Sequence, residues 1–101
     1  MSITKKFLKT KPVCKVTFEL SKVGAKNAET VHLVGDFNQW DQHNLPMKKQ
    51  KDGSFKIVLD LATGHEYQFR YVLDDTLWKN EDGADGYAPS PFGDNNSLLK
   101  I

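Results

Sequence analysis

The sequence contains a single cysteine, no long apolar run and almost no excess of charge. With Cys14 as the one thiol among 101 residues, the chain has no internal disulfide and no second sulfur ligand for a zinc site. A net charge of +1 gives little long-range attraction for nucleic acid. No apolar run approaches the length that spans a bilayer, and the basic residues 1–11 do not lead into the apolar segment of a signal peptide. We therefore expect a cytoplasmic protein with no nucleic-acid partner and no membrane contact.

What the sequence does contain is enough apolar material for one folded domain. Hydrophobic residues make up 39% and aromatic residues 11% of the chain, which supports a single core without disulfides. We expect a solvated basic arm over residues 1–12, followed by one domain over residues 13–101. There is no internal repeat and no linker. Because the chain ends on its last predicted strand, we expect any catalytic body to be another polypeptide.

Apolar and polar residues alternate in a series of short segments, a pattern typical of half-buried β-strands. Strands of this kind are expected over residues 13–20, 30–34, 54–61, 66–73, 77–79 and 97–101. Residues 21–29 are polar and predict a loop, and residues 81–96, rich in Gly, Asp, Asn and Pro, predict a longer one. No segment has a helical period. Short strands separated by turn residues predict an all-β fold, a β-sandwich.

Two tryptophans follow the ends of predicted strands. The run Val31–Trp40 ends in Gly-Asp-Phe-Asn-Gln-Trp, a turn that places Trp40 beyond its strand, and Trp78 comes after the alternating run Glu66–Leu73. The axial hydrogens of a sugar make one face of its ring apolar. An exposed indole can cover that face while amide and charged groups bond the hydroxyls. This combination favours carbohydrate binding.

Several short motifs, in order over about two-thirds of the chain, resemble those of one family. They are Val31–Trp40, Asp52–Phe55, Leu61–Tyr71, Trp78 and Phe92–Ser97. In these segments the chain is similar to the glycogen-binding domains of carbohydrate-binding module family 48. Such domains occur at the N-terminus of isoamylases and glycogen-branching enzymes and in the β subunit of the AMP-activated kinase. The resemblance implies an immunoglobulin-like, early-set β-sandwich that binds α-1,4-linked glucans such as glycogen, starch and maltodextrin.

The resemblance also implies which residues contact the sugar. The tryptophan after the Phe-Asn turn falls on Trp40, the basic residue of the long central strand on Arg70, and the tryptophan beyond the following turn on Trp78. An asparagine just before the last strand falls on Asn96, with Asn95 as its neighbour. The alternation of its own strand supports Arg70 independently, because it turns this side chain away from the apolar face.

Both tryptophans also have a structural interpretation. Trp40 could cap the core of the sandwich, and Trp78 could pack against the loop of residues 81–91. The turn at residues 74–77 is one residue longer than the Asp-Gly turn usual in the family, which changes how Trp78 is presented.

The polar candidates have structural interpretations too. Arg70 could pair with Asp36 or Asp74 on a solvated face. Asn96 could be a turn residue that satisfies backbone groups. Gly35, in the middle of the first tryptophan motif, is expected to serve backbone conformation.

No catalytic or metal-binding motif is evident. The acidic residues within 81–85 suggest a carboxylate pair or a calcium loop, but they lack the spacing of an EF-hand. His32, His43 and His65 show no metal-ligand spacing, and no Gly-x-Ser-x-Gly elbow is present. We therefore predict no enzymatic activity, no catalytic residue, no metal and no cofactor.

A second interpretation of the function is a protein-interaction module. An early-set sandwich can dock onto a glycoside hydrolase or another enzyme of glycogen metabolism. Buried tryptophans would favour this interpretation, and exposed ones would favour glucan binding.

Overall fold

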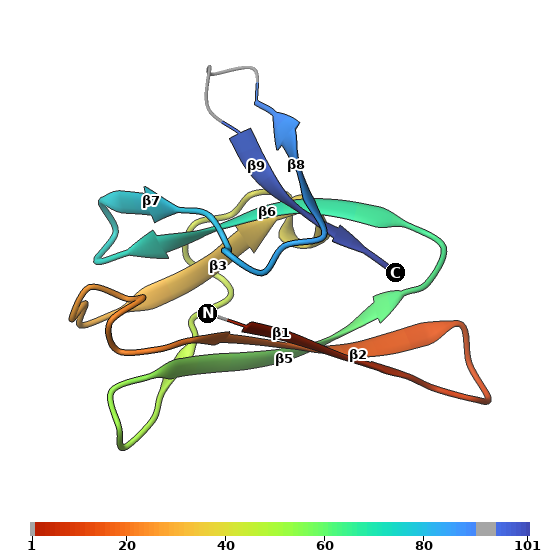
Figure 1. The fold of residues 1–101 in the computed structure, drawn as a ribbon, viewed down its shortest axis with the longest axis horizontal. Helices are drawn as coiled ribbons and strands as arrows, with labels where there is room; N and C mark the ends of the chain where they lie inside the picture. The colour runs from red at the N-terminus through yellow and green to blue at the C-terminus, as the bar shows by residue number, and fades with distance from the viewer. Residues whose placement is uncertain (1, 91–94) are drawn as a thin grey trace.

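The computed structural model describes residues 2–90 and 95–101 and shows two antiparallel β-sheets packed face to face (Figure 1). One sheet has the strand order β1-β2-β5-β4, and the other has the order β3-β6-β9-β8 with β7 paired to β6. The strands are β1 (Ser2–Phe7), β2 (Val13–Leu20), β3 (Val31–Gly35), β4 (Lys48–Lys49), β5 (Phe55–Ala62), β6 (Glu66–Leu73), β7 (Leu77–Lys79), β8 (Gly86–Pro89) and β9 (Asn95–Lys100). This architecture confirms the all-β, immunoglobulin-like sandwich predicted from the sequence.

Helix is almost absent from the described residues. The helical element among them is η1 (Asp36–Asn38), a single 3-10 turn after β3. Within residues 2–90 and 95–101, no helix has the length and apolar character needed to cross a membrane.

The core lies between the inner faces of the two sheets and follows the predicted alternation. Strand β6 covers the residues expected for it, and its Phe69 and Tyr71 are fully buried. Phe69 packs edge-on against Phe18 of β2, with ring centroids 5.3 Å apart. Because successive side chains of a strand point to opposite faces, the residues between these aromatic rings point away from the core.

Strand β1 differs from the prediction, which placed residues 1–12 in a solvated basic arm. Residues 2–7 pair with β2 in continuous antiparallel register. Ile3 packs against the core, and Lys5 Nζ donates a hydrogen bond to Asp85 Oδ2 (2.6 Å) beside the other sheet. The lysines that suggested an arm are typical of an edge strand, which natural sheets protect with charge.

The segment predicted as one long loop, residues 81–96, contains another edge strand. Strand β8 pairs with β9, and β9 begins at Asn95, two residues before the predicted strand. Gly86 and Pro89 are uncommon inside strands, so the sequence did not predict β8, but both residues are tolerated at a sheet edge. Asn96 therefore lies within β9, so its interpretation as a turn residue is wrong. The first residues of the Phe92–Ser97 motif lie outside the described residues.

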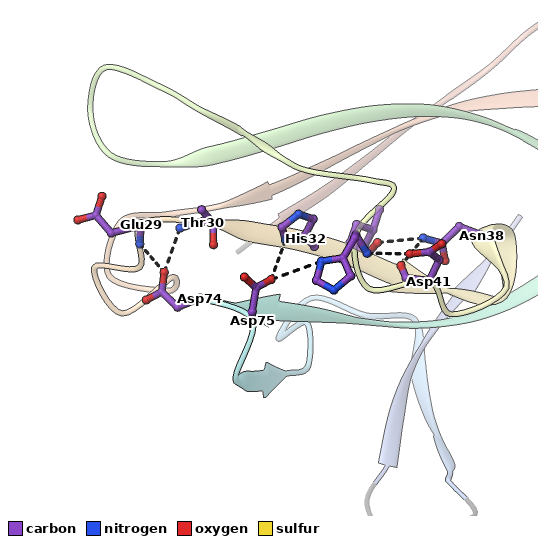
Figure 2. A network of polar contacts seen from close by, with 9 residues as sticks. Glu29, Thr30, His32, Asn38, Asp41, Asp74 and Asp75 are labelled. Carbon is purple, nitrogen blue, oxygen red and sulfur yellow. Dashed lines mark hydrogen bonds and ion pairs between the residues drawn. The ribbon is translucent and has the colours of Figure 1, made fainter.

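The turn between β6 and β7 is attached to the start of β3. Thr76 N donates to Leu73 O (3.1 Å), and between them Asp74 and Asp75 have φ angles of 51° and 61°. Both angles lie in the left-handed region, as a type I′ hairpin turn requires. Asp74 Oδ1 accepts hydrogen bonds from the amides of residues 29 and 30 at 2.8 and 3.0 Å (Figure 2). These bonds fix the position of Asp75 and the start of β7.

Candidate functional site

A cleft of about 610 Å³ lies over the outer face of the sheet that contains β6. Its lining residues are Asp36, Trp40, Gln42, Gln68, Arg70, Trp78, Ser90 and Asn96. The structure thus brings together four of the five residues that the sequence predicted for the site. The fifth, Asn95, is exposed and contributes its backbone carbonyl beside the cleft.

The alternation of β6 places Arg70 in this cleft. Phe69 and Tyr71 point into the core, so Arg70 points outward between them. Strand β6 pairs with β9 along residues 66–69 and with β7 along residues 71–73, on the same side. Arg70 therefore lies at the junction of these two neighbours, where side chains from both can meet it.

Trp40 is held at the cleft by two hydrogen bonds. Its amide donates to Gly35 O (2.9 Å), which closes the turn over η1, and its indole Nε1 donates to Asp36 Oδ1 (2.9 Å). The other carboxylate oxygen of Asp36 accepts from Gln68 N on β6 (2.8 Å). Trp40 is half-buried and lies outside the cluster of buried core residues. The indole is thus oriented by β6 instead of serving as a cap of the core.

Gly35 is required for a close approach, which corrects the expectation that it serves backbone conformation. Its φ of −176° is extended backbone that any residue adopts. A Cβ at this position would lie 2.6 Å from Gln68 O and 2.8 Å from Phe69 Cβ. Only glycine lets the motif sit this close to β6, and this contact places Asp36 within reach of Gln68.

The polar floor of the cleft is a hydrogen-bonded chain of side chains. Arg70 Nε donates to Asn96 Oδ1 (2.8 Å), and Asn96 Nδ2 donates to Gln68 Oε1 (3.0 Å). Arg70 Nη2 also donates to Asn95 O (2.6 Å). The two aspartates considered as partners of Arg70 accept backbone amides elsewhere, one from β6 and the other from the start of β3. The floor therefore combines charged and neutral groups in a fixed arrangement.

Trp78 lines the cleft from β7, which pairs with β6, while Trp40 follows β3, which pairs with β6 on its other side. Trp78 lies opposite Val72 of β6, and its exposed fraction is 37%. The longer turn at residues 74–76 does not remove Trp78 from the cleft, because Asp74 anchors that turn to β3. Exposure of Trp78 at the cleft argues against packing in the interior.

The sequence did not predict four of the eight lining residues as site residues. Two of them, Asp36 and Gln68, lie within the family motifs, and the other two lie outside every motif. Gln42 lies in the loop that follows Trp40, and Ser90 follows β8. Both are ordinary polar loop residues with no motif of their own. They reach the cleft through the tertiary fold, which sequence spacing does not reveal.

Two carboxylates of the acidic segment 81–85 make contacts within the fold. Glu81 is fully buried and accepts hydrogen bonds from Tyr71 Oη (2.9 Å) and Gly83 N (2.7 Å). Burial, reinforced by the neighbouring Glu81 carboxylate, raises the pKa of Tyr71 well above its ordinary value. Asp85 pairs with Lys5, and neither Glu81 nor Asp85 lines the cleft. These carboxylates are engaged in holding strands together.

Comparison with known proteins gives a consistent result. The family described as carbohydrate-binding module 48 (isoamylase N-terminal domain) matches residues 15–88. The 1,4-alpha-glucan branching enzyme GlgB of Butyrivibrio fibrisolvens is 35% identical over 78 residues, which are 75% of this chain and 11% of that enzyme. The enzyme of the same name from Aquifex aeolicus (strain VF5) is 45% identical over 50 residues, which are 46% of this chain and 8% of that enzyme. The chain thus spans about a tenth of the length of these curated relatives.

Proposed function

The chain belongs to the carbohydrate-binding module 48 family, and on this premise we propose that its cleft binds α-1,4-linked glucans such as glycogen, starch and maltodextrin. The observation that supports this most strongly is the meeting of Trp40, Arg70, Trp78 and Asn96 around one cleft of about 610 Å³. These residues come from four separate segments of the chain. An indole at either side of a polar floor matches a sugar ring, which has apolar faces and a polar edge.

Stacking on the two indoles supplies most of the proposed binding energy. If each tryptophan covers about 100 Å² of sugar, area bookkeeping gives ~2.5 kcal/mol for each and ~5 kcal/mol for both. Hydrogen bonds to the polar floor add to this gain, and ordering the oligosaccharide opposes it. A dissociation constant of roughly 10 µM to 1 mM follows for a linear maltooligosaccharide.

The polar floor supplies the proposed specificity. Arg70, Asn96 and Gln68 already bond to one another, so their donors and acceptors are oriented before the sugar arrives. Such preorganisation lowers the ordering cost of binding. Asp36 holds the Trp40 indole in the same way, through the amide of Gln68.

We propose that the chain binds glucan without cleaving it. The buried Glu81 and the paired Asp85 act in the fold, and catalysis would belong to a separate domain or polypeptide. The relatives named above are branching enzymes, so an enzyme of glucan metabolism is the partner that we propose to act beside this module. A reducing cytoplasm, suited to the unpaired Cys14, is the proposed location.

Isothermal titration with a maltodextrin series and with glycogen tests this proposal. We expect saturable heats with maltoheptaose in the stated range, and no release of reducing sugar from starch by the pure protein. Phe7→Ala is a matched aromatic control, because Phe7 is 56% exposed on β1 of the other sheet. If Phe7→Ala weakens binding as much as Trp40→Ala does, the cleft is not the site.

A further inference from the structure

Two histidines and an aspartate meet at the end of the sheet near the cleft, although they are far apart in the sequence. Asp75 Oδ1 lies 3.7 Å from His32 Nδ1 and 3.7 Å from His43 Nδ1. The three donor atoms all lie within 4.8 Å of one another. Figure 2 shows His32 on β3 facing Asp75 in the turn after β6. The sequence showed no metal-ligand spacing, because the fold alone brings these residues together.

The distances fit metal ligands better than hydrogen-bonded partners. A nitrogen and an oxygen 3.7 Å apart are too distant for a hydrogen bond. Ligands bonded to one tetrahedral ion at 2.0–2.1 Å lie about 3.4 Å from each other. His32 Nδ1 is also buried without a hydrogen-bond partner among the described residues, and the His32 side chain is only 14% exposed. A buried ring nitrogen with its lone pair or proton unsatisfied points to a missing partner at this place.

The backbone segments that carry Asp75 and His43 are held in position by their surroundings. The bonds of Asp74 to the start of β3 fix the turn that presents Asp75. His43 N donates to Asp41 Oδ1 (2.9 Å). Asn38 Nδ2 donates to Asp41 O (3.1 Å), and Figure 2 shows these two residues together, so the loop around His43 is ordered. Supported ligands of this kind bind a metal with less loss of conformational freedom.

We propose that His32, His43 and Asp75 bind one divalent transition-metal ion, of which zinc is the representative. Two imidazole nitrogens and one carboxylate oxygen suit zinc and its neighbours, whereas calcium and magnesium prefer sites made of oxygen alone. The side chains of His43 and Asp75 are 70% and 55% exposed, so an ion can enter from solvent and water can complete its coordination.

The position of this site gives the ion a structural role. His43 belongs to the loop that begins at Trp40, and Asp75 lies three positions before Trp78 in the chain. An ion shared by them ties the loop behind Trp40 to the turn that leads into β7. The two segments that carry the indoles are then joined through the ion.

Titration of the full chain, free of any histidine tag and treated with chelator, with ZnCl₂ tests the site directly. We expect one ion per chain and a higher melting temperature with zinc. His43→Gln and Asp75→Asn should each weaken zinc binding by at least about tenfold. His43 is mostly exposed, so its variant keeps the fold, which circular dichroism verifies. His65→Gln and Asp60→Asn, at exposed positions outside the cluster, are the matched controls and should bind as the parent does.

Three results would overturn the proposal. One is an affinity for zinc that His43→Gln and Asp75→Asn leave unchanged, and another is an equal loss in His65→Gln. The third is binding of magnesium as tight as that of zinc, which would indicate an unspecific charge effect. No glucan is present in this titration, so its outcome is independent of the proposed carbohydrate binding.

Discussion

At the scale of single residues, Trp40 combines a bulky side chain with an unfavourable backbone conformation. Its φ is 59°, and the preceding Gln39 has 57°. A residue other than glycine in this region costs on the order of 1–3 kcal/mol and persists where its surroundings hold it. The bonds to Gly35 O and Asp36 Oδ1 provide that hold. The conformation turns the indole toward β6 and so toward the cleft.

We predict that Trp40→Ala weakens maltoheptaose binding by about 2 kcal/mol or more, roughly 30-fold, because a stacking surface is lost. Stability should change little, since Trp40 lies outside the buried core cluster. Titration calorimetry and thermal melting on this one variant measure both effects. A loss of ~3–5 kcal/mol in stability with normal binding by the folded fraction would instead identify Trp40 as a core residue.

Gly35→Ala should lower the free energy of unfolding by ~1–3 kcal/mol, because the new methyl group would meet the backbone oxygen of Gln68. Chemical denaturation measures the loss. Gly86→Ala is the matched control: its added Cβ would lie at an ordinary 3.5 Å from Leu98 Cδ1, and it should leave stability nearly unchanged. Equal effects of the two substitutions would contradict the close-approach role of Gly35.

At the scale of elements, the predictable strands were those whose own alternation is complete. The alternation of apolar and polar residues predicts strands β2, β5 and β6, because one face of each is buried in the core. Strands β1 and β8 are edge strands, and their existence depends on pairing with a distant partner. The lysines of β1 suit an edge strand, but by themselves they predict a solvated arm. The glycine and proline of β8 also suit an edge strand, but by themselves they predict a loop.

The contact between β1 and the second sheet should make stability depend on pH. Burial opposes ionisation of Asp85, but the Lys100 amide and the Lys5 ammonium outweigh it, so the pKa of Asp85 is lowered. A carboxyl group with a lowered pKa in the folded state stabilises that state above its unfolded pKa of about 3.8, and the stabilisation disappears as pH falls through the folded value. Asp85→Asn should therefore destabilise the protein at pH 7, with a difference that shrinks toward pH 2.

Urea denaturation of Asp85→Asn and the parent at several pH values measures this dependence. Asp60→Asn, an exposed position on β5, is the matched control and should follow the parent at every pH. A stability difference for Asp85→Asn that stays constant from pH 7 to pH 2 would show that the carboxylate charge is not what matters.

At the scale of the whole molecule, the two faces of the sheet that contains β6 differ in what they form. Its inner face carries Phe69 and Tyr71 and forms part of the core, while its outer face carries Arg70 and the cleft. Motifs could predict Trp40, Arg70 and Trp78, because the two tryptophans follow recognisable turns and Arg70 lies within a strand of clear alternation. Their role in binding sugar stays a prediction.

Other parts of the surface could not be predicted from local patterns. His32 and Asp75 are 43 positions apart and meet because Asp74 ties the turn after β6 to the start of β3. Gln42 and Ser90 likewise join the cleft only in the folded molecule. Such juxtapositions depend on strand pairing, which residue types at a given spacing do not encode.

The most direct test of glucan binding in the cleft is the ¹H–¹⁵N spectrum of the labelled chain during titration with maltoheptaose. The chain has two tryptophans, so its two indole N–H signals report on the two walls of the cleft. We predict that both signals move together and saturate with a dissociation constant of roughly 10 µM to 1 mM. Indole signals that stay unchanged at millimolar maltoheptaose, or shifts confined to strands β1, β2 and β5, would contradict the account.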